Sequence, residues 1–256
     1  MNRSTQVNTS SESVEKVFSE AGGEFITPAS QIAEKLKNIK VYLFDWDGVF
    51  NAGVKGEGTH STYAEPDSMG TNLLRFGHWL KSDELPLFGI ITGQNNKSAF
   101  ELSRREHFQF VYYSLPNKIE AVNHIESIYE ITRDRIAFVF DDALDLSIAA
   151  ACGLRFLVTR TASPLFERYV RENHLCDYIC AHVGDEYAVR EVCELILGLA
   201  GVYSEALDER IKFSDKYSSY LSKRISGSTS CYTMSNGAII EKNIFWKKGN
   251  HENIGY

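Results

Sequence analysis

The sequence has no long apolar run and little proline, and each scarcity excludes a class of protein. No stretch approaches the roughly 18–20 apolar residues that cross a bilayer, so we expect no association with a membrane. Residues 1–20 contain no apolar segment, and we therefore expect no secretory signal. With 5 Pro, 18 Gly and 43% hydrophobic residues among 256, the composition also excludes collagen-like and largely disordered chains.

Positively charged residues are fewer than negatively charged ones, and cysteine is scarce. The chain has 27 Lys and Arg against 34 Asp and Glu, a formal net charge of −7. The basic residues do not cluster, so we expect no nucleic-acid partner. The 5 cysteines are scattered, and Cys176 and Cys180, the closest pair, have no second pair beside them to complete a zinc site. We expect buried free thiols in a cytoplasmic protein.

Short apolar runs alternate with longer amphipathic ones through most of the chain. The runs predicted as strands are rich in β-branched and aromatic residues. They are Val41–Phe44, Leu87–Thr92, Phe110–Tyr113, Ile136–Phe140 and Phe156–Thr159. The predicted helices are Met69–Lys81, Asn96–His107, Lys118–Glu130, Leu144–Cys152, Pro164–Asn173 and Glu186–Leu199. This alternation predicts an α/β fold, a three-layer Rossmann-like domain with a parallel sheet.

Three segments fall outside this alternation. Residues 1–23 are rich in Ser, Thr, Asn and Glu, which predicts a flexible N-terminus before a domain over residues 24–201. Residues 50–65 are rich in Gly and Thr and predict a small β-hairpin flap. Residues 202–256 predict a C-terminal extension, with a charged helix to about Arg224 and then a partly disordered Ser- and Gly-rich end.

Polar residues gather where the predicted strands end, and ligands of parallel sheets bind at those ends. The set is Asp45, Asp47, Thr92, Lys118, Asp141, Asp142 and Asp145. Each alone could be a helix cap or a surface residue. Together, so many carboxylates at one edge repel one another unless a cation is present, and hard oxygen ligands select Mg²⁺. The hydroxyl of Thr92 and the charge of Lys118 then favour a phosphate beside the metal.

The segments FDWDGV, ITG, Lys118 and FDDALDL occur in the order of the four motifs of haloacid dehalogenase superfamily phosphohydrolases, which the chain resembles. From Val41 to about Leu199 it further resembles the branch of 3-deoxy-manno-octulosonate 8-phosphate and nonulosonate 9-phosphate phosphatases. The resemblance implies Mg²⁺-dependent hydrolysis of a small sugar or nonulosonate phosphate. It also implies that no large cap domain is present and that the chain forms a homo-oligomer, a tetramer in that branch.

The resemblance also implies catalytic and metal-binding roles. Asp45 would be the nucleophile that takes the phosphoryl group, and Asp47 the general acid and base. Mg²⁺ would be held by Asp45, the main-chain carbonyl of Asp47, and Asp141. The carboxylates of Asp142 and Asp145 would support these ligands from outside.

The remaining implied roles concern the substrate. Thr92 and Lys118 would bind phosphoryl oxygens. The implied substrate-binding residues are Gly48, Gly93, Gln94 and Asp67. The chain departs from the family pattern at Asn51, at Gln94 where an Arg is common, and at Phe140 where a Gly is common. Several of the departures lie on the side expected to face the sugar.

Two other functions fit parts of the pattern. A receiver-type signalling domain also places acidic residues, a hydroxyl and a Lys around Mg²⁺. Such domains have the acidic pair first and the acceptor Asp later, which is the reverse of the order here. A catalytically idle relative with a regulatory or structural role would have lost at least one of Asp45, Asp47, Lys118 and Asp141, and all four are present.

Overall fold

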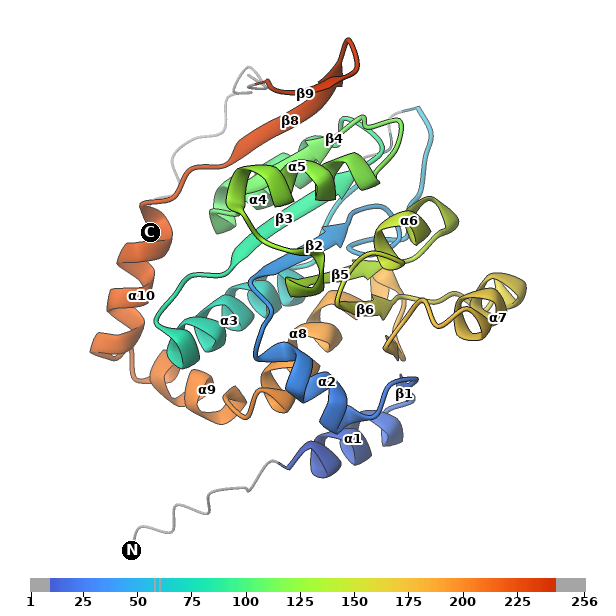
Figure 1. The fold of residues 1–256 in the computed structure, drawn as a ribbon. Coiled ribbons are helices and arrows are strands. Elements are labelled where there is room, and N and C mark those ends of the chain that lie inside the picture. Colours follow the sequence, from blue (N-terminus) through green and yellow to red (C-terminus); the bar gives the residue numbers. More distant parts are fainter. Residues whose placement is uncertain (1–9, 58, 60, 243–256) are drawn as a thin grey trace, which may run out of the picture.

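The computed structural model describes residues 10–57, 59 and 61–242, and Figure 1 shows their arrangement. These residues form one nine-stranded sheet in the order β1-β7-β6-β5-β2-β3-β4-β8-β9. The strands are β1 (Glu24–Phe25), β2 (Val41–Asp45), β3 (Leu87–Thr92), β4 (Phe110–Tyr113), β5 (Ile136–Phe140), β6 (Leu154–Leu157), β7 (Tyr178–Ile179), β8 (Ser230–Ser235) and β9 (Ala238–Glu241).

Helices cover both faces of the sheet (Figure 1). The α-helices among the described residues are α1 (Ser11–Glu20), α2 (Ala29–Leu36), α3 (Glu65–Ser82), α4 (Lys97–Glu106), α5 (Ile119–Tyr129), α6 (Leu146–Ala149), α7 (Pro164–Glu172), α8 (Ala188–Leu199), α9 (Tyr203–Ile211) and α10 (Asp215–Ile225). Short 3-10 helices are η1 (Arg133–Arg135), η2 (Ala143–Asp145) and η3 (Gly184–Glu186). The predicted α/β fold with a layer of helices on each face is therefore confirmed.

The central strands are apolar on both faces because each face meets a different layer of helices. In β2, Tyr42 and Phe44 pack into the core shared with α3 and α8, whereas Val41 and Leu43 pack into the core shared with α5 and α6. Successive strand residues point to opposite faces, so both sets of side chains must be apolar. The near-continuous apolar runs that predicted the strands follow from this double burial.

The connections place a topological switch point between β2 and β5. From β2 the chain proceeds through α3 and α4 to β3 and β4 on one side, then returns through α5 to β5 on the other side of β2. β2 pairs in parallel with both β3 and β5. Loops that leave neighbouring strands in opposite directions open a crevice between them at their carboxyl ends, where ligands bind.

The sheet is mixed rather than wholly parallel, which corrects the predicted parallel sheet at its two edges. β1 pairs antiparallel with β7, and β9 pairs antiparallel with β8. β9 comes from the predicted C-terminal extension, and β1 lies at the start of the predicted domain, before its first predicted strand. The seven strands from β7 to β8 in the sheet order are parallel.

The N-terminal segment is part of the fold from residue 10 onward, so the predicted flexibility of residues 1–23 is wrong for that part. α1 begins after Ser10, whose Oγ accepts a hydrogen bond from the backbone N–H of Ser13. Val14 is buried in the core against α8, at Gly198. Because α1 buries a single residue, its other residues can be polar. The polar composition of this segment therefore does not reveal that it is a helix. Residues 1–9 lie outside the described residues.

The predicted β-hairpin flap is instead an irregular loop in the described part of residues 50–65. No strand is formed there, and the regular pairing is limited to an isolated bridge between Asp47 and Asn51. The Asn51 side-chain amide donates to the carbonyls of Trp46 and Thr62 and so closes the base of the loop. Side-chain bonds to the backbone thus replace a strand ladder. Gly58 lies outside the described residues.

The C-terminal extension is built into the domain. The predicted helix is two helices, α9 and α10. The expectation of a partly disordered end is wrong for residues 230–241, which form β8 and β9. β8 continues the sheet beside β4, with Cys231 in one core and Tyr232 against the other. Residues 243–256 lie outside the described residues.

Two expectations about residue classes can be checked directly. All five cysteines are buried and none is in a disulfide, as predicted. Among the helices of the described residues, none is long and apolar enough to cross a membrane.

A buried carboxylate holds the β1 edge of the sheet. Asp177, just before β7, accepts hydrogen bonds from Thr27 Oγ1 at 2.8 Å, Lys35 Nζ at 3.0 Å and Arg155 Nε at 2.8 Å. Burial on its own would raise the pKa of Asp177, but these bonds and the charge of Arg155 outweigh it and lower the pKa. The charged form is therefore the one that stabilises the fold.

We expect Asp177→Asn to lower the free energy of unfolding at pH 7 by about 1–3 kcal/mol, because the buried position loses the charge that binds the partly exposed Lys35 and Arg155. An Asp with a lowered folded-state pKa stabilises the protein above its unfolded value of about 3.9 and loses that effect as the pH falls below it. The difference between wild type and variant, measured by urea unfolding from pH 7 to pH 3, should therefore shrink on acidification. Asp208→Asn, at an exposed carboxylate, is the control. A difference independent of pH would contradict this account.

Candidate active site

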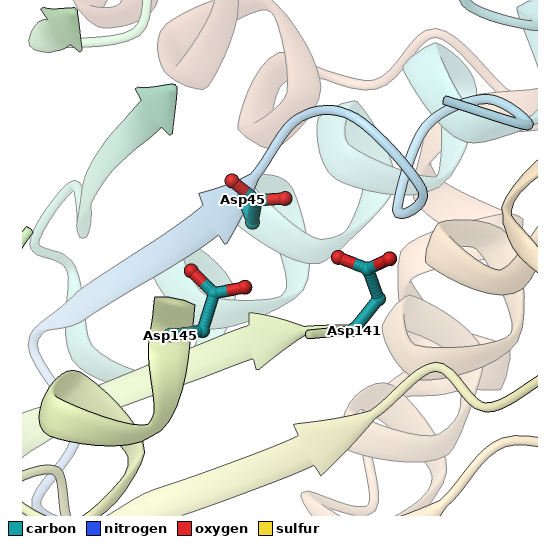
Figure 2. Close-up of side chains that lie close together, drawn as sticks. All are labelled: Asp45, Asp141 and Asp145. Carbon is teal, nitrogen blue, oxygen red and sulfur yellow. The ribbon is translucent and has the colours of Figure 1, made fainter. Parts of the chain in front are cut away.

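Three carboxylates meet at the switch point of the sheet (Figure 2). Asp45 is the last residue of β2, Asp141 directly follows β5, and Asp145 ends η2. One oxygen from each lies within 4.8 Å of the others, and all three side chains are buried. Because β2 and β5 are neighbours in the sheet, their ends bring together residues almost a hundred positions apart.

These residues fit a divalent cation. The Oδ1 atom of Asp141 and the Oδ2 atom of Asp145 are buried without a hydrogen-bond partner. Unpartnered buried carboxylate oxygens are costly, and an all-oxygen donor set suits Mg²⁺. Asp45, Asp141 and Asp145 would therefore hold the ion. The sequence predicted Asp45 and Asp141 as ligands, but it predicted Asp145 only as a supporting carboxylate.

The electrostatics of the cluster lead to the same conclusion. Burial, and then the charge of Asp45, raise the pKa of Asp141 to about 8 and that of Asp145 to about 7. Burial also raises the pKa of Asp45, against the opposing effect of Lys118. Three buried carboxylates therefore cannot all ionise easily without a further cation among them.

Lys118 lies at the start of α5 and supplies positive charge to this cluster. Its Nζ atom donates to Asp45 Oδ1 at 2.5 Å and to Asp145 Oδ1 at 2.7 Å. Burial alone would lower the pKa of Lys118, but the charges of the two aspartates outweigh it and raise the pKa. The raised pKa favours the charged ammonium form, which lies beside the Asp45 carboxylate.

Asp47 and Thr92 form a second group, joined through Asn96. The Asp47 carboxylate accepts from Lys55 Nζ at 2.5 Å, Ser61 Oγ at 2.7 Å and Asn96 Nδ2 at 2.9 Å. Asn96 Nδ2 also lies 2.8 Å from Thr92 Oγ1. Burial would raise the pKa of Asp47, but the three hydrogen bonds outweigh it and lower the pKa. The side chain of Asp47 thus faces the loop rather than the carboxylate cluster.

A cavity of about 260 Å³ opens in front of these groups. Its lining includes Asp45, Asp47, Lys118, Asp141, Asp145, Gly93 and Gln94. Gly48 has a positive φ of 97°, and a Cβ atom there would overlap the Arg160 guanidinium and the Asp141 carboxylate. Gly93 has open space around it. The structure therefore places Gly93 and Gln94 at the cavity, and Gly48 packs directly against the cluster.

Two predicted site residues lie apart from the cluster. Asp142 lines the cavity, but its side chain is exposed and caps η2 through the N–H of Ala143. Asp67 is fully buried at the start of α3 and accepts from the backbone N–H of Arg190 at 2.9 Å. Burial raises the pKa of Asp67 to about 7. Asp67 thus joins α3 to α8 and does not reach the cavity, so its predicted contact with substrate is wrong for this chain.

The departures from the family pattern also differ in where they lie. Phe140 is fully buried and stacks with Phe138, at 5.7 Å between ring centroids, so it packs in the core away from the cavity. Asn51 closes the loop over residues 50–65 and lines a neighbouring cavity of about 340 Å³. Gln94 is the departure that lines the cavity with the carboxylates.

Sequence reasoning missed four polar residues at the site, namely Arg160, Lys55, Ser61 and Asn96. Arg160 pairs with Asp141 through an N–H of its guanidinium. Lys55 and Asn96 bind Asp47. Arg160 directly follows a predicted strand, so the argument from strand ends could have found it. Lys55 lies in the loop that was predicted as a hairpin, and no signal in the sequence turns it toward Asp47.

Comparisons with known proteins agree with this geometry. No protein-family model matches the chain. The 3-deoxy-D-manno-octulosonate 8-phosphate phosphatase KdsC of Escherichia coli (strain K12) is 26% identical over 201 residues, which cover 76% of this chain and 100% of the relative.

Solved structures show the same likeness. A 3-deoxy-D-manno-octulosonate 8-phosphate phosphatase from Moraxella catarrhalis, in complex with magnesium ion, phosphate ion and KDO, is 25% identical with a TM-score of 0.58. The match covers 70% of this chain and 97% of that one. The corresponding phosphatase from Yersinia pestis shares the fold at 24% identity and a TM-score of 0.56, over 68% of this chain and 88% of that one. In sequence and in fold, the chain is similar to the haloacid dehalogenase superfamily phosphatases, and within them to the 3-deoxy-D-manno-octulosonate 8-phosphate phosphatase branch.

Proposed function

We propose that this protein is a Mg²⁺-dependent phosphomonoesterase that acts through an aspartyl-phosphate on a small sugar or nonulosonate phosphate. The observation that carries the proposal is the buried cluster of Asp45, Asp141 and Asp145 with Lys118 bound to it. A bound metal ion would offset the repulsion between these buried carboxylates. The metal ion and Lys118 would then attract an anion. A phosphate monoester is the anion that these residues suit.

The comparisons support the reaction class and the metal. The sequence relatives carry the name of a phosphatase, and a related structure holds magnesium and phosphate. The sugar is the finer part of the proposal, and it is supported by the KDO molecule in the Moraxella catarrhalis structure. The family commonly has an Arg at the position of Gln94. We infer that a difference in sugar preference would arise from this change.

In the first step, a carboxylate oxygen of Asp45 attacks phosphorus and the bond from phosphorus to the ester oxygen breaks. Lys118 beside Asp45, and Thr92 at the end of β3, bind the phosphoryl oxygens as negative charge spreads over them. Asp47 donates a proton to the departing alkoxide. A substrate that draws Lys55 away from Asp47 would favour the protonated form needed for this donation.

In the second step, Asp47 accepts a proton from a water molecule that attacks phosphorus. The bond between phosphorus and Asp45 breaks, inorganic phosphate leaves, and the Asp45 carboxylate is restored. The hydrogen bonds from Lys55, Ser61 and Asn96 hold Asp47 as the carboxylate that this step requires. Asp45, Asp141 and Asp145 would hold Mg²⁺, which would supply positive charge to offset the repulsion between these carboxylates and the phosphate.

We extend the proposal to a homo-oligomer, a tetramer by resemblance, in the cytoplasm. Large apolar side chains are exposed beside the cavities, namely Val54, Leu144 and Tyr187. A neighbouring subunit that covered them would also narrow the entrance to the site. Light scattering on the purified protein measures the assembly, and a monomer at micromolar concentration would contradict this part of the proposal.

Metal removal tests the proposed activity. We expect release of inorganic phosphate from one or more esters in a panel of sugar and nonulosonate phosphates with Mg²⁺. EDTA should abolish it, and added Mg²⁺ should restore it, because the carboxylates repel the phosphate without a cation. The ester with the highest kcat/KM would identify the sugar class. Folded protein that binds Mg²⁺ and hydrolyses none of the esters would contradict the proposal and favour a regulatory or structural role.

A further inference from the structure

Arg160 contributes a positive charge directly to the carboxylate cluster. It follows β6, the neighbour of β5 in the sheet, and the N–H of Val158 donates to the carbonyl of Phe140 at 2.8 Å. This pairing places Val158 beside Asp141, two residues before Arg160, and the Arg160 guanidinium donates to Asp141 Oδ2. The Asp141 side chain is 1% exposed, whereas that of Arg160 is 39% exposed. The arginine can therefore move toward solvent, and the aspartate cannot.

The guanidinium and a divalent cation would compete for the same carboxylate. Asp141 is one of the three residues that fit the ion, and its Oδ2 atom is already bound to Arg160. A second cation brought within a few ångströms of the guanidinium would repel it, since like charges at short distance interact unfavourably. Lys118 does not compete in this way, because its partners are Asp45 and Asp145.

The space into which Arg160 would move is the cavity itself, which it lines together with Lys55 and Lys118. Lys55 is paired with Asp47, and Lys118 with Asp45 and Asp145. A released Arg160 would become a cation without a carboxylate partner in front of the proposed phosphate site. Its planar group of N–H donors suits the oxygens of a phosphate or a carboxylate.

We propose that Arg160 neutralises Asp141 in the metal-free protein and, once displaced by the divalent cation, binds an anionic group of the substrate in the same cavity. This inference rests on the proposed function and deepens it. It makes Arg160 a residue that links metal binding to anion binding, with opposite effects on the two. Its removal should favour the metal and disfavour the anion, a pattern that a merely structural arginine would not produce.

Calorimetric titration with Mg²⁺ alone, without any substrate, tests the first half. We expect Arg160→Gln to bind Mg²⁺ roughly tenfold more tightly than wild type, because a competing charge has gone. Arg168→Gln, at an exposed position on α7 outside the lining of the cavity, removes the same charge and serves as the control. It should change the affinity by less than about twofold. Arg160→Lys, which keeps the charge, should give an affinity between wild type and Arg160→Gln.

Titration with inorganic phosphate in saturating Mg²⁺ tests the second half. Arg160→Gln should bind phosphate roughly tenfold more weakly than wild type, because a charge-assisted hydrogen bond is lost. Unchanged or weaker Mg²⁺ binding by both Arg160 variants, or unchanged phosphate binding by Arg160→Gln, would overturn the inference while leaving the proposed phosphatase intact. A wild-type protein that binds no Mg²⁺ would contradict the proposed function and this inference with it.

Discussion

Asp45→Asn should reduce phosphate release by roughly 10⁴-fold or more while the protein remains folded. The amide has nearly the shape of the carboxylate, but it is a poor nucleophile and carries no charge. The lost charge also weakens the cluster as a metal site, because Asp45 is one of its three carboxylates. Initial rates with the best ester of the panel, at saturating Mg²⁺, measure the effect.

A second readout identifies the residue that takes the phosphoryl group. Acid-quenched wild type should carry a phosphoryl group on the peptide that contains Asp45, and mass spectrometry should find none on Asp45→Asn. Asp134→Asn is the matched control, since Asp134 is exposed and precedes β5, at the opposite end of that strand from the site. It should retain full activity. Activity of Asp45→Asn within tenfold of wild type would show that another group attacks phosphorus.

The central strands and the groups at their ends could be predicted from the sequence because both are local signals. β3, β4 and β5 have the predicted boundaries, since each is a short run of apolar residues buried on both faces. Asp45 and Asp141 follow such runs directly. The rule that parallel strands end at one edge then brings them together without knowledge of the sheet order.

What could not be predicted depends on contacts between distant parts of the chain. Asp67 is drawn into the core by the backbone N–H of Arg190, 123 residues away, and no local pattern shows this bond. β8 is a strand because it pairs with β4, about 120 residues earlier, although its Ser-rich sequence is a weak strand signal. In both cases the partner, rather than the local sequence, decides the structure.

The loop over residues 50–65 illustrates a different limit. Its glycines and threonines favour a hairpin by composition, yet the Asn51 side chain bonds to the carbonyls of Trp46 and Thr62 and closes the loop without strands. Lys55 and Ser61 are thereby turned toward Asp47. Composition predicts that a segment turns, whereas the orientation of its side chains depends on individual hydrogen bonds.

The packing of the C-terminal extension should contribute strongly to the free energy of unfolding. α10 lies beside α3 (Figure 1), and Tyr220 of α10 is fully buried there. Its ring centroid lies 5.0 Å from that of Phe76 and 6.1 Å from that of Trp79, both in α3. Its hydroxyl donates to the carbonyl of Asn72 at 3.1 Å. The extension is thus attached to α3, the helix that follows the loop over residues 50–65.

Tyr220→Ala should lower the free energy of unfolding by about 3–5 kcal/mol, because it leaves a cavity between α10 and α3. Tyr220→Phe keeps the ring and removes one hydrogen bond, so it should cost about 1 kcal/mol. Urea unfolding of both variants measures the two values. Since α10 contributes no residue to the lining of the cavity beside Asp45, kcat of Tyr220→Ala should match wild type at temperatures where the variant stays folded. A loss below 1 kcal/mol for Tyr220→Ala would instead mean that residues 202–242 are a loosely attached appendage, and that the domain's stability depends on residues 10–201 alone.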